Sequence, residues 1–257
     1  MMKIGFIGTG EITKAVVLGI LKSKIKYQKI YISERNKKIS NYLKRKSTKI
    51  SIQKYNQDII NKSNFIFLAI TPEVGAKIIK KLNFKKSNIV VSFISTIKLN
   101  DLKKYIKTKC QIVRAIPLPP IALGAGPVPI YPPNKKVRSF FNNIGETIEI
   151  NNEKLSLNFW TMSSMMAPYY EMLNYLASWL TKRGLNKKKA EDYMTSLFLG
   201  LSKSAKFNRF KDLKELVNKS QTPKGLNQQA LRELKKMNFY KNLNLASIKI
   251  LKRLQGK

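Results

Sequence analysis

The chain has 257 residues, of which 43% are hydrophobic, and it carries a net charge of +36 from 50 Lys and Arg against 14 Asp and Glu. This length and hydrophobic content favour a globular protein of one large or two smaller domains. The absence of histidine and the single cysteine, Cys110, exclude a Ser-His-Asp triad, a histidine metal site, an intramolecular disulfide and a zinc site of several thiolates.

Short apolar runs alternate with helical patterns along the first half of the chain. Runs rich in Ile and Val that are separated by helices indicate βαβ units and a parallel sheet covered on both faces. The expected strands are 3–8, 29–33, 50–54, 65–70, 89–94 and 111–116, followed by an extended segment over 126–133. The expected helices are 11–21, 36–45, 56–63, 73–82 and 99–106.

The pattern changes after about residue 150, where helical periodicity dominates and strand signals disappear. The stretch "LNFWTMSSMMAPYYEMLNYLASWLTKRGL" is expected to form one long apolar helix that ends at Arg183-Gly184. Further helices are expected over 187–206, 210–219, 226–237 and 240–254. The sequence therefore predicts an α/β Rossmann-type domain with a parallel sheet over 1–150 and an all-α domain over 151–257.

A glycine turn, Gly8-Thr9-Gly10, joins the first expected strand to the first expected helix. The first glycine permits a tight turn, and the second lets a pyrophosphate approach the N–H groups at the helix N-terminus. Thr13 stands at the third position of G-x-G-x-x-G and is expected to loosen the packing of helix on strand. The strand–turn–helix–strand context favours dinucleotide binding; the alternative is a structural corner without a ligand.

The end of the second expected strand, "ISERNKK", bears on the choice of dinucleotide. An acidic residue there holds the adenosine ribose of NAD, whereas an arginine accepts the additional phosphate of NADP. We interpret Ser33 and Arg35 as holders of that phosphate and Glu34 as pointing away from it. The alternative is an ordinary solvated loop.

These segments together resemble the pyrroline-5-carboxylate reductase family, whose members make proline from a cyclic imine with NAD(P)H. "KIGFIGTGEITKAVVLGI", "YISERNKK" and "NQDIINKSNFIFLAITPEV" are similar to its opening, its second-strand turn and its ribose-binding segment. "QIVRAIPLPPIALGAGPVPIYPP", "MMAPYYEMLNYLASWLTKRGLNKKKAEDYMTSLFLGLSKSA" and "NKSQTPKGLNQQALRELKKMNFY" are similar to a later strand and loop, the dimerising helices and the Ser-Pro-Gly-Gly loop. The resemblance implies an NADP-binding domain over 1–150 and a helical dimerisation and substrate domain over 151–257.

The glycine turn and the resemblance together give a set of candidate cofactor-binding residues. In the family an Asn, here Asn56, meets the ribose, and an Ala-x-x-Pro, here Ala69 to Pro72, lies beside the cofactor. The expected cofactor is NADP, and no metal site is expected. The full set is Gly8, Thr9, Gly10, Glu11, Ile12, Ser33, Arg35, Asn56, Ala69, Thr71 and Pro72.

Departures from the family pattern fall where the resemblance places the substrate. Leu118 lies in "IPLPP", where the family has Met-Pro-Asn-Thr-Pro, so that an amide and a hydroxyl are lost. Met166 stands where the family places a hydroxyl close to the imine, and Leu226 removes a hydroxyl from the Ser-Pro-Gly-Gly-Thr-Thr loop. A ring pocket of lower polarity is expected; for Met165 and Met166 the alternative is ordinary core packing.

The resemblance also implies which residues hold the substrate. The family's loop grips a carboxylate with backbone N–H groups at a helix start, and Lys224 adds a cation to it here. The candidates for handling the proton of the imine nitrogen are Tyr170, Thr222 and Ser164. The substrate-binding candidates are Met166, Thr222, Pro223, Lys224, Gly225 and Leu226.

Three functions stay open at this point. The first is an NADPH-dependent reductase of pyrroline-5-carboxylate, and the second is a reductase of the same architecture with a less polar imine or carbonyl substrate. The third is a cofactor-holding dimer without turnover or a nucleic-acid binder. Hydride transfer to an imine fits a chain without histidine because the cofactor carries the reaction.

The partners are inferred from charge and from the apolar helices. A strong positive charge suggests nucleic acid or an anionic membrane, but Lys, Asn and Ile are abundant throughout the chain, which favours compositional drift. The helices of the second half carry many large apolar residues, which predicts a homodimer or a larger homo-oligomer. We expect a small-molecule substrate, no specific nucleic acid, no membrane segment and a cytoplasmic location.

Overall fold

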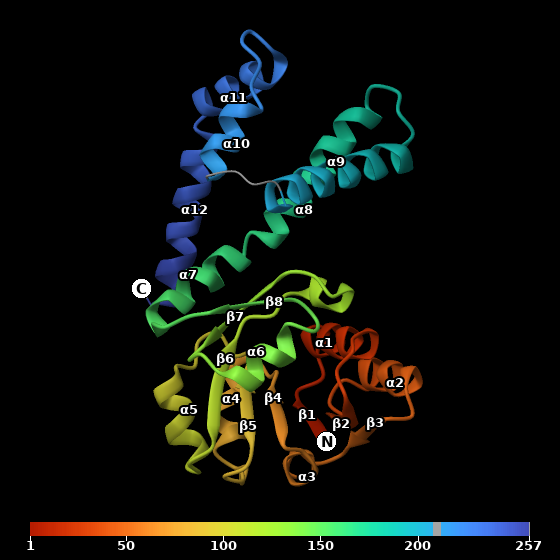
Figure 1. Ribbon diagram of the computed structural model, residues 1–257, viewed down its shortest axis with the longest axis vertical. Helices are drawn as coiled ribbons and strands as arrows, with labels where there is room; N and C mark the ends of the chain where they lie inside the picture. The colour runs from red at the N-terminus through yellow and green to blue at the C-terminus, as the bar shows by residue number, and fades with distance from the viewer. Residues whose placement is uncertain (208–211, 257) are drawn as a thin grey trace. The chain divides into compact units, whose positions relative to one another are not determined.

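The computed structural model describes residues 1–207 and 212–256, and it divides the chain into two compact units, Met1–Trp160 and Thr161–Lys257 (Figure 1). The first unit is a sheet with helices, and the second consists of helices. The predicted fold class is thereby confirmed. The division falls inside helix α7 (Glu153–Ser163), whereas the change in composition at residue 150 precedes this helix.

The first unit is built on one eight-stranded sheet with the order β3-β2-β1-β4-β5-β6-β7-β8. All neighbouring strands run parallel except β6 and β7, which are antiparallel. The strand order reverses between β1 and β4, and such sheets bind ligands at the carboxyl ends of the strands at this point. The strands are β1 (Met2–Ile7), β2 (Tyr27–Ser33), β3 (Ile50–Gln53), β4 (Phe65–Leu68), β5 (Ile89–Ser92), β6 (Gln111–Ala115), β7 (Pro127–Tyr131) and β8 (Glu146–Glu149).

Aromatic rings and close helix packing hold the helices on this sheet. The rings of Phe6 and Phe67 stack with 4.6 Å between their centroids, and Phe140 lies 5.2 Å from Phe67. A Cβ on Gly19 would lie 2.5 Å from the carbonyl oxygen of Ile121, so glycine lets the first helix approach the loop after β6. The helices are α1 (Glu11–Lys22), α2 (Lys37–Lys46), α3 (Asn56–Lys62), α4 (Pro72–Ile79), α5 (Leu99–Ile106), α6 (Lys135–Phe141) and the short 3-10 helix η1 (Pro119–Leu123).

The long apolar helix expected from Leu157 onward is interrupted. α7 ends at Ser163, and α8 (Met166–Thr181) begins after a turn at Ser164 and Met165. Pro168 gives the physical reason, because proline has no N–H to donate to the carbonyl of Ser164 and its ring would clash with that carbonyl in a continuous helix. The prediction of a single helix is therefore wrong.

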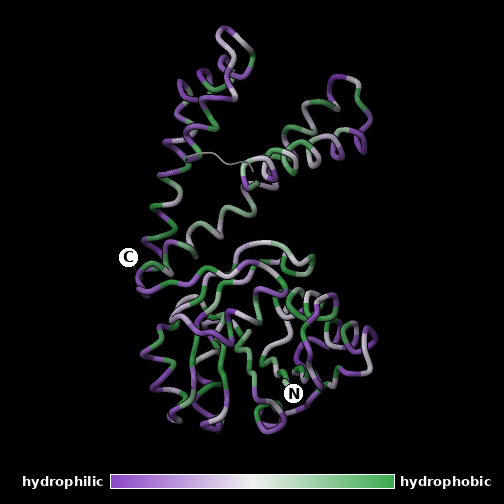
Figure 2. The backbone as a smooth tube through the Cα atoms, in the orientation of Figure 1, coloured by the Kyte–Doolittle hydropathy of each residue, from purple (hydrophilic) through white to green (hydrophobic). Residues whose placement is uncertain are grey.

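The second unit buries few side chains. α8 and α9 (Lys187–Phe207) share a small core of Ala177, Ala190 and Met194. α10 (Leu213–Lys219), α11 (Leu226–Lys236) and α12 (Phe239–Leu254) contain no buried residue, although hydrophobic and hydrophilic positions alternate along α11 and α12 (Figure 2). Of the helix expected over 210–219, the first two residues lie outside the described residues. The apolar side chains of α11 and α12, such as Leu234 and Leu243, are exposed in a single chain and need a further surface to cover them.

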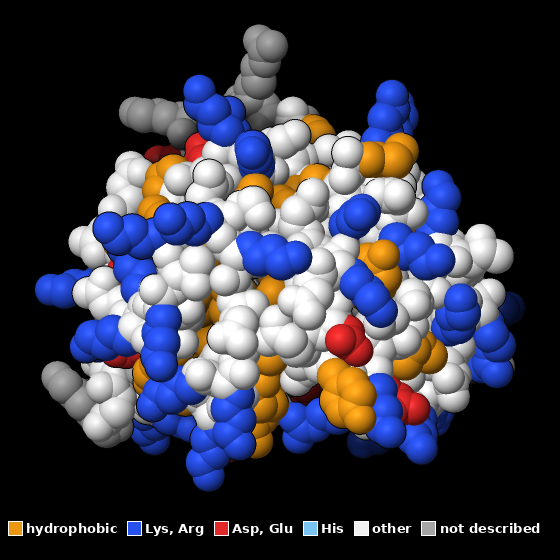
Figure 3. Space-filling model, turned by 90° about the horizontal axis from the view of Figure 1, so that it is seen from below, with side chains coloured by type: hydrophobic (Ala, Val, Ile, Leu, Met, Phe, Trp, Pro, Cys, Tyr) orange, Lys and Arg blue, Asp and Glu red, His pale blue; other side chains and the backbone are white. Residues whose placement is uncertain are grey.

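Positive charge is spread over the face of the molecule drawn in Figure 3. Lys and Arg side chains are scattered over the face in Figure 3, with few acidic side chains among them. Among the described residues, no helix has the length and apolar character needed to cross a bilayer. The same residues contain no group of three or more His, Cys, Asp or Glu side chains placed to hold a metal ion.

Candidate active site

The glycine turn is held in a conformation that only glycine can adopt. Gly8 has a φ of +98°, and a Cβ there would run into the backbone carbonyl of Ala69 at the end of β4. Positive φ and the lack of space both exclude a larger residue. The turn therefore brings the ends of β1 and β4 together where the strand order reverses.

Buried hydroxyl groups fix the same turn. The N–H of Gly8 donates to the hydroxyl of Ser33 at 3.1 Å, and the hydroxyl of Thr9 donates to the carbonyl of Ser33 at 2.6 Å. Thr13 is fully buried and donates to the carbonyl of Gly8 at 2.7 Å. The expectation that Thr13 loosens the packing is wrong, because this hydrogen bond ties α1 to the turn.

A hollow of about 600 Å³ lies over the turn, and we call it the turn hollow. Gly10 lines it, and a Cβ on Gly10 would meet no protein atom within 4 Å, so the protein's own packing does not require glycine here. No side chain caps α1 at Gly10, which leaves the first N–H groups of the helix for an anion. The turn hollow is lined by Gly8, Thr9, Gly10, Arg35, Asn36, Lys37, Ala69, Ile70 and Thr71.

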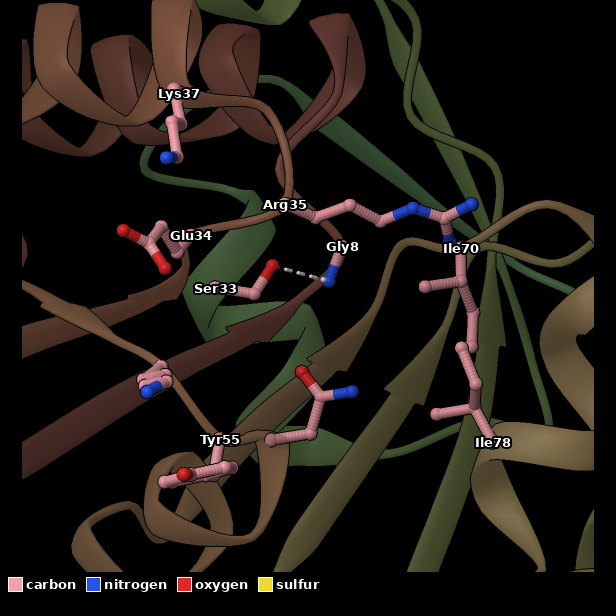
Figure 4. A pocket seen from close by; sticks show the side chains of 10 residues that line it. Gly8, Ser33, Glu34, Arg35, Lys37, Tyr55, Ile70 and Ile78 are labelled. Carbon is pink, nitrogen blue, oxygen red and sulfur yellow. Dashed lines mark hydrogen bonds between the residues drawn. The ribbon is translucent and has the colours of Figure 1, made fainter.

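A second hollow, of about 400 Å³, lies at the carboxyl ends of β2 and β3, and we call it the strand-end hollow (Figure 4). The Arg35 side chain extends past Gly8 toward Ile70, and the Glu34 carboxylate is turned away from Gly8 (Figure 4). Within residues 1–207 and 212–256, no hydrogen bond or salt bridge engages the Arg35 guanidinium. The strand-end hollow is lined by Gly8, Ser33, Glu34, Arg35, Lys37, Lys54, Tyr55, Asn56, Ile70 and Ile78.

Most cofactor candidates from the sequence line these two hollows, but three do not. Glu11 forms an exposed ion pair with Lys14 at 3.1 Å, Ile12 packs against the core, and Pro72 is the first residue of α4. Thr71, at the rim of the turn hollow, hydrogen-bonds the Glu73 carboxylate and thereby lowers the pKa of that exposed group.

Lys54, Tyr55, Ile70 and Ile78 also line the strand-end hollow but are not among the cofactor-binding residues predicted from the sequence. Lys54 and Tyr55 directly follow β3, and Ile70 follows β4 by two residues. The carboxyl ends of parallel strands meet at one edge of a sheet, so the position of these residues after a strand is a signal that could have identified them. Ile78 lies late in α4 and has no comparable signal.

An ion pair between the buried Arg114 and the partly buried Glu153 holds the loop that follows β5. Arg114 of β6 donates from Nη1 to Oε1 of Glu153 at 2.7 Å and from Nη2 to the carbonyl of Ser95 at 2.7 Å. The same Glu153 oxygen accepts the N–H of Leu99 at 2.7 Å, at the start of α5. The pair therefore joins β6, the β5–α5 loop and the first turn of α7 within the first unit.

The catalytic candidates lie at the α7–α8 turn and in the loop before α11. The Ser164 hydroxyl donates to the carbonyl of Thr161 at 2.6 Å, Met166 is the first residue of α8, and Tyr170 is exposed one turn later. Thr222 is exposed in the second segment. Within residues 1–207 and 212–256, no hydrogen bond joins Ser164, Met166 or Tyr170 to Thr222.

The loop over 222–225 leads into α11, and two of its N–H groups already donate within the protein. Lys224 adopts a φ of +62°, its N–H donates to the side chain of Gln228 at 3.0 Å, and Gly225 precedes α11 without a side-chain cap. The carbonyl of Thr222 accepts the N–H of Gly225 at 2.8 Å. Leu226 follows as the first residue of α11, and its side chain is exposed.

Two family models match the chain. Residues 3–96 match the model described as NADP oxidoreductase coenzyme F420-dependent, and residues 154–256 match pyrroline-5-carboxylate reductase dimerisation. Among curated proteins, pyrroline-5-carboxylate reductase from Haemophilus influenzae is 23% identical over 211 residues, covering 78% of this chain and 77% of that protein. The Staphylococcus saprophyticus enzyme is 26% identical over 243 residues, covering 89% and 88%.

Solved structures share the fold over the whole chain. The pyrroline carboxylate reductase of Plasmodium falciparum with NADP bound matches with a TM-score of 0.85 at 20% identity, over 99% of this chain and 97% of that one. The 1-pyrroline-5-carboxylate reductase of Streptococcus pyogenes matches with a TM-score of 0.85 at 22% identity, over 100% and 99%. A reductive aminase from Aspergillus terreus in complex with NADPH matches with a TM-score of 0.59 at 11% identity, over 97% and 87%.

Proposed function

Because the chain belongs to the pyrroline-5-carboxylate reductase family, we propose that it reduces pyrroline-5-carboxylate to proline. It is an NAD(P)H-dependent oxidoreductase, and its cofactor is NADP. The observation that carries the proposal is the pair of adjoining hollows at the glycine turn, which offer uncapped helix N–H groups and an arginine that forms no ion pair with any described residue.

The residues present fit a phosphorylated dinucleotide. The space beside Gly10 and the first N–H groups of α1 suit a pyrophosphate, and Arg35 suits the 2′-phosphate. Asn56 lies at the strand-end hollow, where it would meet the ribose. When bound, NADPH supplies the hydride that reduces the carbon of the C=N bond.

The second unit supplies the proposed substrate contacts. The N–H groups at the start of α11 and the Lys224 ammonium bind the carboxylate, because both are positive at this helix end. Tyr170, Thr222 and Ser164 are the hydroxyl groups proposed to supply the proton of the imine nitrogen. Since Ser164 already donates to Thr161, Tyr170 and Thr222 need less rearrangement for this role.

A less polar cyclic imine or carbonyl compound is the second candidate substrate. Leu118, Met166 and Leu226 favour it, because they stand where the family pattern has an amide or hydroxyl groups. NADPH oxidation followed at 340 nm with a panel of cyclic imines, pyrroline-5-carboxylate included, distinguishes the two. Turnover of pyrroline-5-carboxylate supports the first proposal, turnover of only the apolar imines supports the second, and no turnover of any imine contradicts both.

Replacing Arg35 by alanine is expected to weaken NADPH binding by about 1.5–3 kcal/mol, the range for charge-assisted hydrogen bonds to a phosphate. NADH binding should hardly change, because NADH lacks the 2′-phosphate. The measurement is the dissociation constant of each cofactor by titration calorimetry. Arg45→Ala, an exposed arginine of α2 outside both hollows, is the control. Equal weakening of both cofactors by Arg35→Ala would contradict the assignment.

The protein is expected to be a homodimer or larger at micromolar concentration, measured by light scattering. Leu197 and Leu201 lie one turn apart on α9 and are exposed in a single chain. We therefore propose that a second copy of the chain packs against these two side chains. Leu197→Glu combined with Leu201→Glu should shift the protein toward monomer. The control is Leu123→Glu in the first unit, where the leucine is also exposed. A monomeric wild-type protein contradicts the prediction.

A further inference from the structure

The strand-end hollow is lined by a lysine from the β3 side as well as by the arginine proposed to select NADP. In the parallel pair, Ser33 lies opposite Gln53, and the N–H of Glu34 donates to the carbonyl of Gln53 at 3.2 Å. Lys54 therefore leaves β3 level with Glu34, and Arg35 follows Glu34 by one residue. Both Lys54 and Arg35 line the strand-end hollow.

The charges around this hollow are unbalanced. Arg35, Lys37 and Lys54 line it, and the only carboxylate among its lining residues is Glu34, which is turned away from Gly8 (Figure 4). No salt bridge to any of these cations exists within the part of the chain that the structure describes. Like charges that share a hollow repel each other, and a bound anion relieves that repulsion.

Lys54 differs from Arg35 in where it can act. Arg35 lines both hollows and extends past Gly8 toward Ile70, whereas Lys54 lines the strand-end hollow alone (Figure 4). The Lys54 ammonium lies 5.6 Å from the centre of the Tyr55 ring, a cation–π contact that restricts its position at the rim.

We propose that Lys54 is a second cofactor-selecting residue, which binds the 2′-phosphate of NADPH from the β3 side while Arg35 binds it from the β2 side. A phosphate monoester carries a charge of about −1.5 to −2 at pH 7, so one arginine leaves much of that charge uncompensated. Arginine offers a planar bidentate fork and lysine a point charge, and the two can act on different oxygens of one phosphate. The inference rests on the proposed NADPH-dependent function and adds the residue that sets its selectivity.

The test measures dissociation constants of NADP⁺ and NAD⁺ by titration calorimetry for the full-length protein. Lys54→Ala should weaken NADP⁺ binding by roughly tenfold and change NAD⁺ binding by less than about twofold, since one charge-assisted contact is lost. Lys54→Arg should keep most of the affinity. Lys86→Ala is the control, because this exposed lysine precedes β5 at the amino end of that strand, whereas the hollow lies at the carboxyl ends of β2 and β3.

The outcomes separate this inference from the proposed function. If Arg35→Ala selectively weakens NADP⁺ and Lys54→Ala does not, the role of Lys54 is refuted and the function stands. Equal loss of NADP⁺ and NAD⁺ affinity on Lys54→Ala also refutes that role, provided that the variant's thermal melt matches wild type. If the wild-type protein binds NADP⁺ no better than NAD⁺, the proposed NADP selectivity itself fails.

Discussion

Replacing Glu153 by alanine is expected to destabilise the first unit by about 3–5 kcal/mol, the usual cost of removing one partner of a buried ion pair. The Arg114 side chain is 4% exposed and that of Glu153 23%. Without Glu153, the buried guanidinium keeps only its bond to the Ser95 carbonyl within the described residues, and the Leu99 N–H loses its acceptor. An uncompensated buried charge is costly because the surroundings solvate it poorly.

Urea unfolding followed by circular dichroism measures this change, and a lower midpoint with an unchanged slope identifies it as a loss of stability. Glu149→Ala is the matched control, because the Arg138–Glu149 pair has side chains 49% and 29% exposed at a similar distance of 3.1 Å. An exposed pair contributes at most about 1 kcal/mol. If both variants lose the same small amount of stability, the Arg114–Glu153 pair does not hold the β5–α5 loop as described.

The substitution Met166→Thr is expected to raise the kcat for pyrroline-5-carboxylate. A lost hydrogen-bond donor at a site of developing charge costs about 2.7–4 kcal/mol in the barrier, by analogy with oxyanion-hole deletions. A hydroxyl at the first residue of α8 is proposed to restore part of that stabilisation. The expected result is an increase in kcat of at least about tenfold.

Steady-state rates with saturating NADPH measure the effect of Met166→Thr. The control is Met237→Thr, since Met237 is an exposed methionine between α11 and α12. An efficient wild-type enzyme whose rate does not respond to Met166→Thr would show that Met166 does not face the imine. In that case the sequence of α8 is wrongly aligned with the family pattern.

The sheet was predictable because its strands are short, apolar and bounded by turns. β4 and β5 are buried along their whole length and read as uninterrupted hydrophobic runs. β8 was missed because its sequence, "ETIE", is mostly exposed and takes its structure from pairing with β7. α6 was also missed, although Val137, Phe140 and Phe141 have helical spacing and Asn134 caps its start through two hydrogen bonds of 3.1 Å.

Some residues of the site can be identified from a local sequence motif, whereas others reach the site only through the three-dimensional fold. Gly8 and Gly10 belong to a contiguous motif, so the sequence identifies them without knowledge of the fold. Lys54 and Tyr55 reach the strand-end hollow only through the register of β2 and β3, which no local pattern specifies. The role of Thr13 was misjudged because its hydrogen bond to Gly8 depends on the close packing of α1 against the turn.

Deuterium transfer tests the central claim, reduction of pyrroline-5-carboxylate with NADPH, most directly. The wild-type protein is incubated with pyrroline-5-carboxylate and NADPH that carries deuterium at the hydride position of its nicotinamide ring, and the product is analysed by mass spectrometry. We expect proline that carries one deuterium on the carbon of the former C=N bond, formed faster with NADPH than with NADH at equal, subsaturating concentration. Absence of labelled proline, while a less polar cyclic imine acquires the label under the same conditions, would contradict the account.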